Sequence, residues 1–355
     1  MASYKDCAKK VGLSDEVDAY LRGEMDPDDQ AFREHLSQKK IEAMNQAYQR
    51  KLEAIAHADA ADFINLYPGS ARQAIRAYLS QDDLATGRTS VDDQIHGVTR
   101  YYMGKLNTII EEADGRTWKQ KLFSTGANTD AKYNDNILRE IFGRATGDAD
   151  AAKFAKIWRD LAEDLRIQIN KSGGLIRKLD DWGMPQKHIV AKMTAAGKAE
   201  WINFTAPKLD LQRMGISDEN AARVMLDKVY DTIVTNGANK LDPDNLPRTG
   251  KGKLANQHRE HRALHFADPE EWIDYAKEFG DGDAIGAMIS HVRDMSRDLG
   301  MLRAMGPNPE SVYQGMRARV LHEADLSAKG AGKHPGSGTN QIDNIWADLN
   351  GLGVE

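Results

Sequence analysis

Residues 283–302, DAIGAMISHVRDMSRDLGML, decide the fold of this chain. Apolar side chains recur in this stretch at alternating steps of three and four residues, which is the spacing of a helix that packs one narrow face against another helix. The members of this face are Ile285, Met288, Val292, Met295, Leu299 and Leu302. Because the repeat covers fewer than three heptads, it predicts a contact between two helices rather than a free-standing coiled coil.

Clear helix start and stop signals occur along much of the rest of the chain. A capping residue followed by proline marks a helix start, and glycine marks a helix end. The starts are Asp26-Pro27, Asp268-Pro269 and Asn308-Pro309, and the ends are Gly173-Gly174, Gly280 and Gly306-Pro307. The first start precedes a long amphipathic helix, with separate shorter helices expected at 60–66 and 70–79. Its apolar side consists of Phe32, Leu36, Ile41, Met44, Tyr48, Leu52 and Ile55.

These patterns predict an all-α fold of irregular multi-helix bundles with long amphipathic helices, because no stretch alternates as a strand does. Gly, Pro and Lys residues predict an exposed loop near 237–257, and a Gly-rich flexible linker at 328–340 precedes a short helix at 342–349. We expect an N-terminal helical region at 1–174, a second helical region at 175–327, and the linker with its short helix at 328–355.

Composition narrows the class of protein. The chain has 355 residues, 41% of them hydrophobic and 29% charged, which is typical of a folded chain. Its net charge of -6 argues against a dedicated duplex-DNA binder, because such proteins usually carry a strong basic excess. Cys7 is the only cysteine, which excludes an intrachain disulfide and fits synthesis in a reducing cytoplasm. No run approaches the about 18 consecutive apolar residues that a membrane-spanning helix needs.

A group of histidines follows the predicted loop. On a helix, His258, His261 and His265 would share one side, and His291 could supply a fourth ligand to zinc or a similar metal. The pattern is not H-E-x-x-H, so the alternative is a polar hinge whose side chains bond backbone carbonyls. We favour the hinge and expect no catalytic residue, metal or cofactor. A metal-dependent hydrolase centred on the three histidines is the alternative of a different class.

Residues 240–262 are also the most basic part of the chain. They contain three acids and six basic residues, Lys240, Arg248, Lys251, Lys253, Arg259 and Arg262. Such a patch fits a contact with phosphate or nucleic acid, and it fits an arginine-rich protein interface at least as well. We therefore predict that His258, Arg259, His261 and Arg262 take part in interactions.

The helix expected after Asp268 carries Trp272, Tyr275 and Phe279. Aromatic side chains anchor many oligomer interfaces, and they also fill hydrophobic cores, so both interpretations stay open. Together with the apolar face of residues 283–302, these aromatics complete the predicted interaction surface.

Two stretches of the chain resemble segments of the long internal virion proteins of tailed bacteriophages, and together they span roughly residues 165–310. The first comprises His258-Arg259-Glu260-His261-Arg262, Leu264, Phe266, Trp272, Tyr275, Phe279-Gly280, Gly282-Asp283, His291, Met295 and Gly306-Pro307-Asn308-Pro309. The second comprises Asn170, Gly173-Gly174, Ile176, Pro185-Gln186, His188 and Trp201.

The resemblance implies a core or ejection protein that is made in the host cytoplasm and packaged in the capsid near the portal. Such proteins leave ahead of the DNA and reassemble as a conduit across the host envelope. The implied partners are copies of the same chain, other internal or portal-associated proteins, phage DNA in a transient contact, and the host envelope after assembly. No glutamate here stands in a lysozyme-like setting, so we expect no enzymatic activity. A non-ejected scaffold or adaptor at the head or portal is the alternative role.

Overall fold

The computed structural model describes residues 30–80, 87–114, 131–176, 186, 188–235, 253–257, 264–280, 284–330 and 339–350. Helices make up the regular structure of these residues, which confirms the predicted all-α class, and an isolated antiparallel bridge joins Leu209 to Phe266. The elements are α3 (Gln30–Leu66), α4 (Ala71–Ser80), α5 (Val91–Asp114), α7 (Ala131–Ile141), α8 (Ala149–Lys171), α9 (Val190–Ala196), α10 (Lys198–Thr205), the 3-10 helix η1 (Ala206–Lys208), α11 (Glu219–Val234), α12 (Leu254–Gln257), α13 (Pro269–Phe279), α14 (Ala284–Met305), α15 (Pro309–Gly330) and α16 (Asn340–Leu349).

Local signals explain several of the helix boundaries. Asp268 caps α13, because its carboxylate accepts the backbone N–H of Glu271 at 3.0 Å, as the sequence predicts. Helix α8 ends just before Gly173, whose φ of 102° is unfavourable for other residues. Pro309 is the first residue of α15, as predicted. The predicted start at Asp26-Pro27 lies outside the described residues.

Helix α3 is longer than the sequence analysis predicts. It runs without a break for 37 residues to Leu66, so the expected separate helix at 60–66 is wrong. The reason is that the segment AHADAAD at 56–62 contains four alanines and neither glycine nor proline, and alanine has the highest helix propensity. The chain first turns at Pro68-Gly69, before α4.

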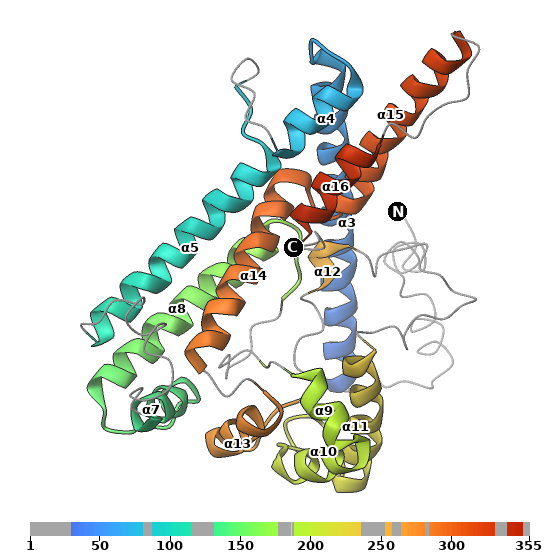
Figure 1. Ribbon diagram of the computed structural model, residues 1–355. Helices are drawn as coiled ribbons and strands as arrows, with labels where there is room; N and C mark the ends of the chain where they lie inside the picture. Colours follow the sequence, from blue (N-terminus) through green and yellow to red (C-terminus); the bar gives the residue numbers. More distant parts are fainter. Residues whose placement is uncertain are drawn as a thin grey trace, which may run out of the picture.

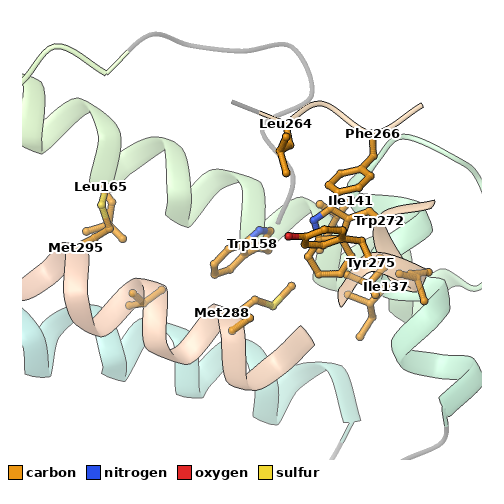
Figure 2. Packing of buried hydrophobic residues seen from close by; sticks show 14 of the residues in the cluster. Ile137, Ile141, Trp158, Leu165, Leu264, Phe266, Trp272, Tyr275, Met288 and Met295 are labelled. Atoms are coloured by element: carbon orange, nitrogen blue, oxygen red, sulfur yellow. The ribbon is translucent and has the colours of Figure 1, made fainter. Parts of the chain in front are cut away.

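A first hydrophobic core lies among α5, α8 and α14, which run side by side (Figure 1). Met288 and Met295 of α14 face Trp158 and Leu165 of α8 (Figure 2). Helices α7, α9, α10, α11 and α13 extend this core at one end. This arrangement buries Met288, Val292, Met295, Leu299 and Leu302 of the predicted apolar face against helices of the same chain.

The crossing of α5 and α14 depends on one glycine. A Cβ atom added at Gly300 would lie 2.6 Å from the Cα atom of Ile95, which is closer than real atoms approach. Only glycine therefore permits this backbone separation, and the packing of the two helices depends on it.

A second core lies among α3, α4, α15 and α16, and the ends of α5 and α14 also contribute to it. The indole of Trp346 in α16 stacks on the ring of Tyr313 in α15, with ring centroids 4.5 Å apart. Its Nε1 donates a hydrogen bond to Glu310 at 2.8 Å. The predicted short C-terminal helix is thus confirmed, and it is docked rather than free.

Other predictions about organisation have mixed outcomes. Residues 254–257 form α12 inside the predicted loop, because Ala255 is buried and its N–H donates to the Pro307 carbonyl at 3.2 Å. Helix α15 continues to Gly330, so the first residues of the predicted linker are helical. Residues 237–252 and 331–338 lie outside the described part. Both cores take residues from each side of position 174, and the division there stays a prediction.

Candidate assembly interface

The histidine and arginine segment lies largely outside the described residues, including His258, Arg259, His261 and Arg262. His265 is described, and its backbone carbonyl accepts the N–H of Asp210 at 2.8 Å. Within the described ranges, no group of three or more His, Cys, Asp or Glu side chains is placed to hold a metal ion. The predicted hinge and the alternative metal site both stay predictions.

The three predicted aromatic anchors are core residues of the single chain. Trp272, Tyr275 and Phe279 are all buried in the first core. The hydroxyl of Tyr275 accepts a hydrogen bond from Trp201 Nε1 at 3.0 Å and lies 2.7 Å from His188 Nδ1. In this fold these side chains are buried against neighbours within the chain and are not exposed to another molecule.

The protonation of this buried group follows from its surroundings. Burial lowers the pKa of His188 to about 4, so its imidazole is neutral at pH 7. Burial raises the pKa of Tyr275, which keeps its proton. Because Trp201 can only donate, the Tyr275 hydroxyl accepts from the indole and donates to His188 Nδ1. Trp201 and His188 lie 74 and 87 positions before Tyr275 in the sequence. Their contacts with Tyr275 therefore cannot be predicted from the sequence.

The predicted face of α14 is buried as well. Met288, Val292, Met295, Leu299 and Leu302 all belong to the first core, and the side chain of Ile285 is outside the described part. The contact between two helices that the sequence predicts is made within the chain, mainly with α5. The described side chains of this face are therefore not available to another molecule.

Among the described residues, large apolar side chains are exposed at regular spacing on α3. Ile41 is 51% exposed, Met44 64%, Tyr48 42% and Ile55 54%, and we call these four residues the α3 stripe. Their steps of three, four and seven put them on one side of the helix. The buried side of α3 consists instead of Gln49, Ala56, Ala60 and Ile64. The more apolar side of this helix thus faces outward.

Polar contacts explain why α3 is oriented in this way. Gln49 is buried, and its Nε2 donates to the carbonyl of Gly173 at 2.7 Å and to Asn256 Oδ1 at 2.9 Å. Asn45 Nδ2 donates to the carbonyl of Gly174 at 2.9 Å. Gly173 and Gly174 lie in the turn that follows α8, so these amides supply partners to the backbone carbonyls of that turn.

Glu53 continues the same set of contacts. Its carboxylate accepts hydrogen bonds from Lys253 at 2.6 Å and from Asn308 at 2.9 Å. Burial alone would raise the pKa of Glu53, but the Lys253 and Asn308 side chains outweigh it and lower that pKa. Lys253 is the described member of the basic segment, and it is engaged by a carboxylate of this chain. The polar side of α3 therefore binds α8, α12 and the start of α15. The α3 stripe lies outside this contact, except that the Tyr48 hydroxyl at its edge donates to the Lys171 carbonyl of α8 at 2.8 Å.

Charge is distributed unevenly along α3. The basic residues of 37–66 are Lys39, Lys40, Arg50 and Lys51, all in the first half. Three of the four acids, Glu53, Asp59 and Asp62, lie in the second half, and Asp59 pairs with Arg88 at 2.7 Å. The helix therefore has a basic half and an acidic half.

A cleft of about 330 Å³ lies between α3 and α15. Its walls include Ala60, Ile64, Val312 and Met316, and His57 Nε2 lies 3.0 Å from Ser311 Oγ at the same contact. The cleft is mostly apolar and faces a different side of α3 from the α3 stripe. It is large enough for an apolar side chain of another molecule.

Fold and surface together define an all-α protein with an apolar face exposed on its longest described helix. No family model, curated protein or solved structure matches the chain. Among the described helices, none has the length and apolar character needed to cross a membrane.

Proposed function

We propose that this chain is an internal virion protein of a tailed phage that assembles into an oligomer and helps form the DNA-delivery conduit across the host envelope. The observation that carries the proposal is the α3 stripe. Four large apolar side chains on one side of a long helix are a typical feature of a surface that binds another protein. The resemblance over residues 165–310 supplies the phage setting.

The energetics of the α3 stripe support a role in assembly. Fully burying a large apolar side chain is worth about 1.5–3 kcal/mol, and these four are about half exposed. Covering them would therefore contribute about 4 kcal/mol for each copy, before the entropic cost of association. Such a contribution is modest for a single contact and suits an assembly that forms, separates and forms again.

The two stretches that carry the resemblance lie together in space. His188 and Trp201 from one stretch share hydrogen bonds with Tyr275 from the other. A Cβ atom added at Gly173 would lie 2.8 Å from Pro307 Cγ, so these residues abut as well. The stretches belong to one folded unit, as a shared segment of a protein family would. The proposed location is inside the capsid, with other internal or portal-associated proteins as partners.

The composition of virus particles tests the proposal. Quantitative mass spectrometry would measure this chain in purified particles of the encoding phage, before and after DNA release, with the major capsid protein as the internal standard. We expect the chain in full particles and its loss from emptied ones. Retention in emptied particles would favour a scaffold or adaptor at the head or portal. Absence from full particles would refute a virion role.

A further inference from the structure

We propose that the α3 stripe binds the α3 stripe of a second copy of this chain, with the two helices antiparallel and the contact centred between residues 49 and 50. This inference rests on the proposal that the chain works by self-assembly. It adds the surface, the partner and the orientation of the contact.

The spacing along α3 matches a helix-pair seam. Positions 41, 44, 48, 51, 55 and 58 follow the three-four repeat of a coiled coil, and they hold Ile41, Met44, Tyr48, Lys51, Ile55 and Ala58. These six positions cover about 26 Å of helix at 1.5 Å per residue. All six side chains are exposed in the single chain. Every position of the seam is therefore exposed. Lys51 is the one charged residue among these six positions.

Antiparallel pairing about a two-fold axis between residues 49 and 50 joins these positions in complementary pairs. Ile41 meets Ala58 of the second copy, and Met44 meets Ile55. The first pair combines a large with a small side chain, and the second combines two of similar size. Both combinations suit close packing. Tyr48 meets Lys51, whose ammonium then lies over an aromatic ring, a favourable contact for a lysine at a seam.

Charge selects the antiparallel over the parallel orientation. A parallel pair would place Lys51 against Lys51 and the basic half of one helix beside the basic half of the other. Like charges at such short separation are unfavourable. The antiparallel pair brings Lys40, in the basic half of one helix, beside the acidic half of the other, which carries Asp59 and Asp62, and all three are exposed in the single chain.

Small residues beside the seam allow the helices to approach closely. Ala47 and Ala54 lie seven residues apart along one side of it, and both are exposed. The distance between packed helices depends on the side chains at the contact, and alanine gives the shorter distances. In the antiparallel arrangement, Ala47 of one copy lies near Ala54 of the other.

Cysteine cross-linking tests the register and the orientation together. The variants are Met44→Cys and Ile55→Cys, each made in the full chain with Cys7→Ser, and examined alone and as a mixture under mild oxidation. Residues 44 and 55 of one helix are about 16 Å apart, too far for a disulfide within the chain. We expect a disulfide-linked dimer from the mixture and none from either variant alone. Val224→Cys, at an exposed position of α11, is the control for random collision.

Two other cross-linking outcomes would overturn the antiparallel pairing through α3. Efficient cross-linking of Met44→Cys alone would show parallel pairing. Equal cross-linking of Val224→Cys would show random contact. Light scattering of the uncross-linked wild-type chain separates the two proposals. Oligomers without a Met44–Ile55 cross-link would overturn pairing through α3 and leave assembly standing, whereas a chain that is monomeric at every concentration would overturn both.

Discussion

Replacing His188 by asparagine removes a titrating group from the core and keeps an acceptor for the Tyr275 hydroxyl. In the native chain the pKa of His188 is lowered to about 4 from an ordinary value of 6.5, because burial disfavours the charged imidazole. The unfolded chain therefore binds a proton between these pH values that the folded chain does not bind. His188 therefore lowers the free energy of unfolding as the pH decreases from 6.5 towards 4.

The size of this effect follows from the two pKa values. At 1.36 kcal/mol per pH unit, His188 should lower the stability by about 2 kcal/mol at pH 5 and by about 3 kcal/mol at pH 4, relative to pH 8. His188→Asn should lack this contribution. At pH 8 the variant should lose no more than about 1–2 kcal/mol, because the amide oxygen still accepts a hydrogen bond.

Urea unfolding followed by tryptophan fluorescence at pH 8, 6, 5 and 4 measures the difference. Other titrating groups are the same in both proteins, so subtraction of the two curves isolates His188. At pH 8 the native chain should have the higher free energy of unfolding. Towards pH 4 the free energies of the native chain and the variant should converge or cross. Parallel curves over this range would refute the assignment of His188 as a buried neutral base.

Two further predictions concern packing. Gly300→Ala should destabilise the chain by about 2–3 kcal/mol, because the new methyl group collides with the backbone of Ile95, whereas Gly104→Ala, with open space around it, should stabilise by about 0.5–1 kcal/mol. Equal midpoints of thermal unfolding for the two variants would contradict this. Trp346→Ala should remove the stacking on Tyr313 and release α16, at a cost of about 3 kcal/mol. Hydrogen exchange should then show fast-exchanging amides at 340–349, and unchanged protection there would count against the docked position of α16.

The helical class and several helix ends are predictable from the sequence because their causes are local. An acidic cap followed by proline at Asp268-Pro269, or glycine at 173, acts on the nearest turn of the chain. The apolar spacing of α14 likewise predicts a helix-pair contact, and α14 makes one with α5. Such signals need no knowledge of distant segments.

The orientation of α3 is not predictable in this way. Hydrophobic spacing identifies Ile41, Met44, Tyr48 and Ile55 as one side of the helix, but it does not reveal what covers that side. The inward side contains Gln49, whose partners at Gly173 and Asn256 are 124 and 207 positions away. A buried glutamine that binds distant carbonyls gives no apolar signal, so only the folded chain shows which side is free.

Sedimentation equilibrium of the full chain over a wide concentration range tests self-association through α3 most directly. The wild-type chain should reach at least twice the mass of one chain. Met44→Glu should reduce the mass to that of one chain, and the matched substitution Val224→Glu should leave it unchanged. A wild-type chain that keeps the mass of one copy throughout, or a Met44→Glu variant that associates like the wild type, would contradict this role of α3.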